Sequence, residues 1–189
     1  MSTADVGTRH TADELLEMPD SKSFELVDGL LVERNMGLES SWINAQMLIL
    51  LGVYLQGKDL GRVFDSEASY QCFGDDRETV RKPDVSFIRK GRLPNETLTR
   101  GHSQIPPDFA IEVVSPNDRV YELQSKVADY LAAGVSLVWV VNPADRSVTV
   151  YSQESDQPVV VREGSELTGG DVLPEFRCSV SSLFPPGKK

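Results

Sequence analysis

The stretch Phe109–Val114, with the sequence FAIEVV, predicts a buried β-strand that carries one acidic residue, Glu112. A continuous apolar run of this length, rich in β-branched side chains, is typical of a strand covered on both faces. Asp84 stands earlier, in the run RKPDVSFI, which also predicts a strand. An ionised carboxylate in such surroundings is costly unless a cation compensates it. That cation could be an Arg or Lys side chain, but we favour a metal ion.

The residues after this strand predict a βαβ unit. Ser115–Asp118 offers a proline and the polar side chains of a helix start, and Gly134 ends the helix that follows. Leu137–Val141 is a second continuous apolar run. Two strands joined in this way should be parallel neighbours in one sheet.

The N-terminal part predicts a short helix and a hairpin. Thr11 and Glu14 have the spacing of a capping box, so a helix is expected over about 12–18. The runs 24–27 and 30–33 flank Asp28-Gly29, which favours a tight hairpin turn. Glu25 faces away from its two apolar neighbours, so it points either to solvent or toward the acidic pair.

The middle and end of the chain predict further sheet elements. An apolar stripe over Ser41–Gln56 indicates a core-facing helix, and Trp42 at its start is interpreted as a core aromatic rather than as a platform for base stacking. Arg62–Phe73 and Val80–Arg89 are expected to pair as antiparallel strands around a turn at 74–76. The remaining expectations are a long polar loop over 91–107, antiparallel strands at 148–151 and 159–161, and a packed loop over 173–184.

Length and composition predict one globular domain. The chain has 189 residues, 40% of them hydrophobic and 25% charged, which is enough for one sizeable core. We expect a flexible leader over 1–10, a single domain over 11–184 and a flexible tail over 185–189. Because no apolar run approaches about 18 residues and the start lacks the apolar centre of a signal peptide, we expect a cytoplasmic protein with no membrane segment. Two cysteines and two histidines are too few for a disulfide framework or a histidine-rich zinc site.

The charge distribution limits the kind of partner. The formal net charge is −10, which argues against a protein that coats nucleic acid with its whole surface. Seven basic residues nevertheless stand against three acidic ones between Arg77 and Arg100. This basic band flanks Asp84, so it could hold phosphate groups, although a solvated loop explains it equally well.

Five motifs follow one another along the chain. They are ELVDG (25–29), RKPDV (81–85), PDFAIEVVSP (107–116), Lys126-x-x-x-Tyr130-x-x-x-Gly134-Val135 and WVVNP (139–143). In this order they resemble the Uma2 family of endonucleases, within the PD-(D/E)XK nuclease superfamily, and the similarity extends from about Thr11 to Phe184. The resemblance implies an α/β fold of the restriction-endonuclease-like type, with a mixed curved β-sheet and flanking helices.

The same resemblance implies a set of site residues. Asp84 takes the place of the Asp in the PD element, and Glu112 that of the second acid. The superfamily's lysine would stand at Val114, where this chain has none; similar sequences carry it on the next helix, as Lys126 here. Glu25 matches the acid of the ELVDG motif, which the resemblance implies as a further, weaker member of the metal site. The histidine that the family often carries early in its second helix has no counterpart in Glu39–Trp42.

These residues suit metal-dependent phosphodiester cleavage. Mg²⁺ prefers oxygen ligands, and Asp84, Glu112 and the backbone carbonyl of Val113 would suffice for its protein ligands, with Mn²⁺ as a substitute. Lys126 would orient the water and offset phosphate charge, or else form a helix-surface ion pair with Glu122. Arg81 and Lys82 are candidate contacts to substrate phosphates.

We therefore expect a Mg²⁺-dependent endonuclease acting on DNA, and the superfamily resemblance adds a homodimer. Two alternatives stay open. One is an inactive relic of the nuclease fold that serves binding or dimerisation, and the other is a metal-dependent hydrolase of a small phosphorylated substrate. The sequence of Phe109–Val114 and its surroundings does not distinguish them.

Overall fold

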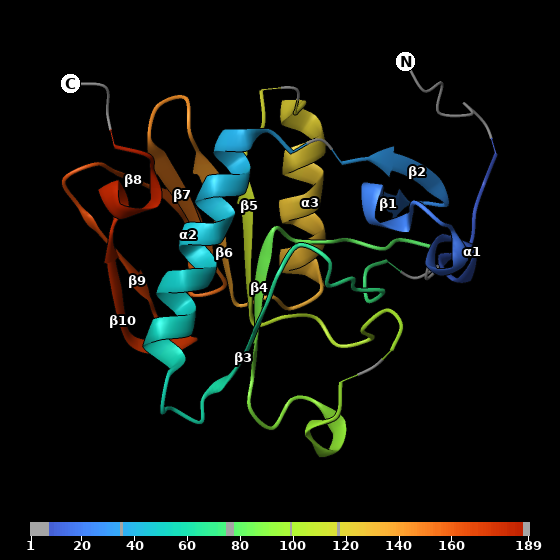
Figure 1. The fold of residues 1–189 in the computed structure, drawn as a ribbon, viewed down its shortest axis with the longest axis horizontal. Helices are drawn as coiled ribbons and strands as arrows, with labels where there is room; N and C mark the ends of the chain where they lie inside the picture. Colours follow the sequence, from blue (N-terminus) through green and yellow to red (C-terminus); the bar gives the residue numbers. More distant parts are fainter. Residues whose placement is uncertain (1–7, 35, 75–77, 99, 117, 187–189) are drawn as a thin grey trace.

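The computed structural model describes residues 8–34, 36–74, 78–98, 100–116 and 118–186 and contains one mixed six-stranded sheet (Figure 1). The strand order is β3-β4-β5-β6-β7-β8, and only β5 and β6 are parallel. The strands of this sheet are β3 (Gly61–Phe64), β4 (Val85–Arg89), β5 (Phe109–Val113), β6 (Leu137–Asn142), β7 (Ser147–Ser152) and β8 (Ser155–Arg162). The fold is therefore a mixed-sheet α/β fold, and the predicted βαβ unit is confirmed.

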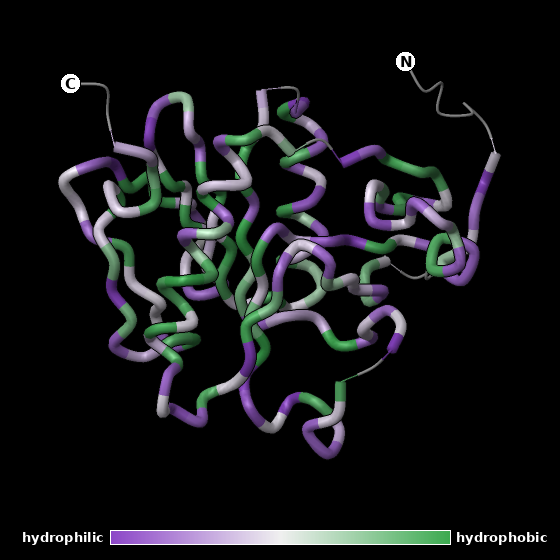
Figure 2. The backbone as a smooth tube through the Cα atoms, viewed as in Figure 1, coloured by the Kyte–Doolittle hydropathy of each residue, from purple (hydrophilic) through white to green (hydrophobic). Residues whose placement is uncertain are grey.

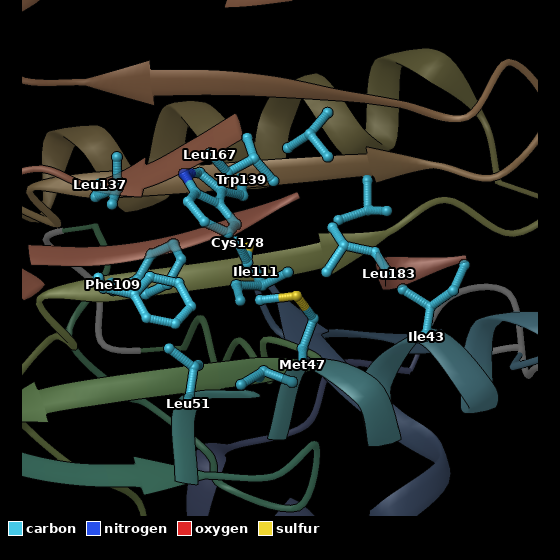
Figure 3. Close-up of a cluster of buried hydrophobic side chains, with 14 of the residues drawn as sticks. Ile43, Met47, Leu51, Phe109, Ile111, Leu137, Trp139, Leu167, Cys178 and Leu183 are labelled. Atoms are coloured by element: carbon cyan, nitrogen blue, oxygen red, sulfur yellow. The ribbon is translucent and has the colours of Figure 1, made fainter. Parts of the chain in front are cut away.

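Two long helices cover the two faces of this sheet. Helix α2 (Leu38–Leu55) packs on one face and α3 (Val120–Ala132) on the other. Figure 3 shows the inward side chains of α2 meeting the central strands. The labelled contributors from these elements are Ile43, Met47, Leu51, Phe109, Ile111 and Trp139.

Alternation along β5 gives each face its own side chains. Phe109 and Ile111 belong to the core under α2, whereas Ala110 belongs to the core under α3. Because successive side chains point to opposite faces, Glu112 lies on the α3 face. In Figure 2 the hydrophobic stretches of the tube gather at the centre of the molecule, where these strands run between the helices.

Two small antiparallel sheets complete the fold. The predicted N-terminal elements are confirmed as α1 (Ala12–Glu17), with its capping box, and as the β1 (Phe24–Val27) and β2 (Leu30–Glu33) hairpin. The short 3₁₀ turn Ser21–Ser23 links them. The second small sheet pairs β9 (Glu166–Gly169) with β10 (Leu173–Ser179), followed by the 3₁₀ turn Val180–Leu183.

The second hairpin corrects the expectation of a packed loop over 173–184. Its strand β10 carries an irregularity between Leu173 and Arg177, and Glu175 there has a φ of 66°. A bulge of this kind breaks the alternation of inward and outward side chains. The strand pattern is therefore hidden in the sequence. The expected packing of this segment is confirmed, because Leu173, Phe176 and Leu183 lie in the core.

The long strands expected over 62–73 and 80–89 were wrong in extent. Only Gly61–Phe64 and Val85–Arg89 form a ladder, and beyond it Tyr70 and Arg81 form an isolated bridge. Pro83 has no N–H to donate to a ladder, which favours an end to the strand there. Of the predicted turn at 74–76, positions 75 and 76 lie outside the described residues.

Three smaller expectations also need adjustment. Helix α3 begins at Val120 rather than at the polar residues before it, because the Asp118 carboxylate accepts the N–H of Ser115 at 2.7 Å and forms a separate turn. Helix α2 begins at Leu38, after the N-cap Gly37. Trp42 is 45% exposed, so its interpretation as a core aromatic was wrong.

The loop over 91–107 is confirmed as largely irregular, with one 3₁₀ turn at Pro94–Glu96. Most of the predicted leader and tail, at 1–7 and 187–189, lies outside the described residues, so their flexibility stays a prediction. Within the part of the chain that the structure describes, no helix is both long and apolar enough to cross a membrane.

Gly61 provides a test of the β3–β4 packing. Its φ is +150°, and a Cβ placed there would lie 2.2 Å from the carbonyl oxygen of Ile88 and 2.6 Å from the Phe87 ring. We expect Gly61→Ala to lower the free energy of unfolding by about 1–3 kcal/mol, measured by urea denaturation. Gly37→Ser is the control: its Cβ meets open space and a serine N-cap is favourable, so stability should not fall. Equal stability of the two variants would contradict this packing.

Candidate active site

Two carboxylates lie side by side at one end of β4 and β5. The antiparallel register pairs Val85 with Ile111, and one further step places Asp84 opposite Glu112. The N–H of Val113 donates to Oδ2 of Asp84 at 2.8 Å, which fixes this arrangement. Both carboxyl groups are almost fully buried. Burial raises the pKa of Asp84, and the nearby Glu25 carboxylate raises it further.

Lys126 reaches this acidic pair from α3. Its Nζ lies 3.2 Å from Oε2 of Glu112 and 3.1 Å from Oε1 of Glu25. Burial acts to lower the pKa of the ammonium, but the charges of Glu112, Glu25 and Asp84 outweigh it and raise the pKa above its ordinary value. Lys126 is therefore a permanent cation among three buried acids.

Glu112 is held by a second group on the same helix. The hydroxyl of Tyr130, one turn after Lys126, donates to Oε1 of Glu112 at 2.5 Å. Burial, together with the Asp84 and Glu25 charges, nevertheless raises the pKa of Glu112 to about 7. Two adjacent carboxylates therefore resist carrying full charge together, although Lys126 and Tyr130 lower that resistance.

Glu25 faces inward from β1 and is fully buried. The sequence left open whether this face of the hairpin meets solvent or the acidic pair, and the structure shows that it meets the pair. One oxygen of Glu25 accepts the N–H of Lys82 at 2.9 Å, and the other lies 3.3 Å from Arg81. Burial acts against the charged form, but Lys126 and Arg81 outweigh it and lower the pKa of Glu25.

Arg81 joins the hairpin to α3. Its Nε and Nη2 donate to Oδ2 of Asp129 at 2.9 and 2.5 Å, while Nη1 reaches Glu25. The neighbouring Lys82 turns its ammonium onto the carbonyl oxygen of Ser21, at 2.5 Å. Both side chains predicted to contact substrate phosphates therefore have partners inside the protein.

Arg34, at the end of the hairpin, closes the opposite side of the site. Its guanidinium donates to the carbonyl oxygens of Ser66 and Lys82 at 3.0 and 3.2 Å, and lies 3.5 Å from Oδ1 of Asp84. A single Arg thus ties β2 to the segment that leads into β4. No pattern in the sequence indicated this role, because its partners are mostly backbone carbonyls.

One cavity of about 330 Å³ is lined by the three acids Glu25, Asp84 and Glu112 and by Lys126 and the two arginines. Its lining residues come from the β1–β2 hairpin, the ends of β4 and β5, the start of α2 and the start of α3; Figure 1 labels these elements. The charged lining residues are Glu25, Asp28, Glu33, Arg34, Arg81, Asp84, Glu112, Asp118, Glu122 and Lys126. Acids outnumber bases among them, so the cavity favours a cation.

The four residues proposed from the sequence, Asp84, Glu112, Lys126 and Glu25, thus meet in one place. Each of the three acids has a partner at both of its carboxylate oxygens. Glu25 is contacted by Lys82, Lys126 and Arg81. Glu112 is contacted by Tyr130 and Lys126, and Asp84 by the N–H of Val113 and, at 3.5 Å, by Arg34. Among the described residues, no three His, Cys, Asp or Glu side chains are grouped in a way that would hold a metal by themselves. Tyr130 was not among the predicted site residues, although it stands in the motif of the family resemblance; its spacing of four from Lys126 was the signal for its polar role.

The fold and this site define a class, the mixed-sheet α/β proteins of the restriction-endonuclease-like type. A family model described as "Uma2: Putative restriction endonuclease" matches residues 12–181. The chain belongs to the Uma2 family.

A solved structure supports the same fold. It is the crystal structure of a protein from Anabaena variabilis ATCC 29413 described as a putative nuclease belonging to DUF820. That structure is similar to this chain with 22% sequence identity and a TM-score of 0.78, and the match covers 92% of this chain and 97% of the other. No curated protein matches the sequence.

The buried Glu25–Arg81 pair gives a stability test of the site. We expect Arg81→Met to cost about 3 kcal/mol, because it removes one of the two cationic partners of the buried Glu25 carboxylate. The double variant Glu25→Gln/Arg81→Met should cost less than the sum of the single changes by about 1–3 kcal/mol. Urea denaturation of the wild type, Glu25→Gln, Arg81→Met and the double variant measures this difference. Arg162→Met, which breaks an exposed pair with Asp145, should change stability by less than about 1 kcal/mol. Strict additivity would show that Arg81 and Glu25 do not interact.

Proposed function

We propose that this protein is a nuclease that hydrolyses phosphodiester bonds of DNA with the help of Mg²⁺, or of Mn²⁺ in its place. The observation that carries the proposal is the convergence of Asp84, Glu112 and the Lys126 ammonium on one cavity. Membership of the Uma2 family, described as "Putative restriction endonuclease", supports it. So does the description of the similar solved structure as a "putative nuclease".

The donor set fits a hard divalent cation. Mg²⁺ binds few protein oxygens and keeps several waters, and two adjacent carboxylates, Asp84 and Glu112, together with the carbonyl of Val113, would hold it. Burial and mutual repulsion destabilise the charged forms of Asp84 and Glu112, so a cation bound between them would stabilise both carboxylates. When bound, such an ion supplies positive charge to the scissile phosphate and activates a water.

The surrounding residues of the chain have distinct tasks in this proposal. Lys126 would offset charge on the phosphate oxygens and orient the attacking water, while Tyr130 fixes the orientation of Glu112. Glu25 holds Lys126 in place, and Arg81 in turn neutralises Glu25. Lys126 thereby supplies, from α3, the ammonium of the lysine that the superfamily motif would place at Val114.

One observation favours a second candidate. The cavity is small, and its lining includes the acids Asp28, Glu33 and Glu122 in a chain that is acidic overall. These charges repel a polyanion such as DNA more strongly than a substrate with few phosphate groups. A cavity of about 330 Å³ suits a small phosphorylated or nucleotide substrate. Assays on double-stranded, single-stranded and branched DNA, run beside nucleotides and phosphomonoesters, separate the two functions by which substrate turns over.

The proposed metal site can be tested by binding and by cleavage. We expect Mn²⁺ to bind saturably in calorimetry, and Asp84→Asn and Glu112→Gln each to weaken binding at least ~10-fold and to abolish DNA cleavage, because each removes an oxygen charge. Asp59→Asn, which changes an exposed acid far along the chain, is the control and should behave as wild type. Binding that survives both acid changes would place the metal elsewhere, and absent binding would support the inactive relic.

Lys126 should affect the chemical step more than metal binding. We expect Lys126→Met to lower kcat for DNA cleavage at least ~100-fold while Mn²⁺ still binds, because it removes charge stabilisation of the transition state. Lys126→Arg keeps the charge but not the compact ammonium, so it should restore only part of the rate. Full activity of Lys126→Met would exclude the role proposed here.

A further inference from the structure

Helix α2 carries a second apolar stripe that faces away from the sheet. At about 100° per residue, Leu38, Trp42, Ile49 and Val53 fall within an arc of roughly 60°. Their side chains are 92%, 45%, 56% and 67% exposed. In Figure 1 this helix lies in front of the sheet, on the side of the molecule nearest the reader. The stripe therefore has no counterpart within the described chain.

This stripe is also free of charge. No charged residue stands between Glu39 and Lys58, although a quarter of the chain is charged. Beside the large residues runs a ridge of small, exposed ones, Ser41, Ala45 and Gly52. A helix that is apolar on its outward face as well as its inward face is typical of one buried in an assembly.

A hollow at the C-terminal end of the helix adjoins the stripe. It has a volume of about 630 Å³ and lies between α2, β3 and Leu98. Its floor includes Gly52 and Val53 of α2 and the edge strand residues Val63 and Phe64. Large side chains thus stand at the N-terminal end of the stripe, and a depression stands at the other end.

We propose that two copies of this chain form a homodimer through α2, with the two helices antiparallel. A two-fold axis passes the outward side of α2 at the height of residue 47 along the helix. This axis sets Trp42 of one copy over Gly52 and Val53 of the other. The same axis sets Ala45 against Ile49. Trp42 and Ile49 of each copy then meet Gly52 and Ala45 of the other, which makes the face complementary to itself, as a two-fold interface requires.

The area and charge of the face favour a second copy over other occupants. The four large side chains expose on the order of 500 Å² per chain, and two such faces together reach the approximately 1,000 Å² that a specific interface needs. Nucleic acid or an anionic membrane surface would call for basic residues, which this face does not contain. The proposal is independent of the nuclease activity, since Asp84, Glu112 and Lys126 take no part in it.

Sedimentation velocity of the full chain tests the dimer. We expect a species of twice 20.9 kDa for the wild type at micromolar concentrations. Ile49→Glu places two acids near the axis and should raise the dimer dissociation constant at least ~100-fold, with an unchanged circular dichroism spectrum. The matched control is Val160→Glu, at a similarly exposed apolar position on the edge strand β8, and it should remain dimeric. A monomeric wild type overturns the proposal, and so does a dimer that Val160→Glu dissociates while Ile49→Glu does not.

Cross-linking tests the antiparallel arrangement even if Ile49→Glu fails to fold. In an antiparallel pair, Ala45→Cys stands about 6 Å along the axis from its copy, whereas Gln56→Cys stands about 27 Å away. A short bis-maleimide should therefore join two chains of Ala45→Cys but not of Gln56→Cys. The wild type, whose Cys178 is buried and Cys72 partly buried, gives the background. Equal cross-linking at both positions indicates parallel helices and overturns the antiparallel model.

Discussion

The ammonium of Lys126 compensates the charge of two buried carboxylates in the interior of this protein. It lies about equally far from Glu25 and Glu112, two acids from elements that are far apart in the chain. Without it, the negative charge of each of these buried carboxylates would be only partly compensated, and an uncompensated buried charge costs several kcal/mol. The positions of β1, β5 and α3 relative to one another are therefore linked through one side chain.

The other polar contacts arrange themselves around that constraint. Arg81 neutralises Glu25 from the side away from Lys126 and reaches Asp129, so the hairpin and α3 are tied twice. Arg34 ties the hairpin to the strand that bears Asp84 through backbone carbonyls. Because the main sheet and the hairpin share no continuous ladder, these polar contacts and the Leu26–Val80 bridge hold the two sheets in register.

The sequence predicted the central part of the fold because the signals there are local. The apolar run of β5, the capping box at Thr11 and the turn at Asp28-Gly29 each specify an element within a few residues, and all three are found in the structure. The predictions failed where a long-range effect decides. The bulge in β10 hides its alternation, and Tyr70 meets Arg81 without a ladder.

The site followed the same division. Asp84, Glu112 and Lys126 could be proposed as neighbours because a strand register and a helix crossing bring them together, and the family resemblance selected them. Arg34 and the pairing of Arg81 with Asp129 could not be predicted, since each depends on how a separate hairpin seats against the domain. Trp42 was misassigned because an aromatic residue at the start of a core-facing helix is more often buried, whereas here it lies on a second apolar stripe that faces outward.

The position of Lys126 late in the chain has a consequence for biosynthesis. As the chain emerges from the ribosome, β1, β4 and β5 are complete before the helix that carries the neutralising ammonium has been made. A chain that ended after β5 would contain Arg34 and Arg81 but not the ammonium that lies between Glu25 and Glu112. The charge of Glu112 can therefore be compensated by Lys126 only after α3 has been made.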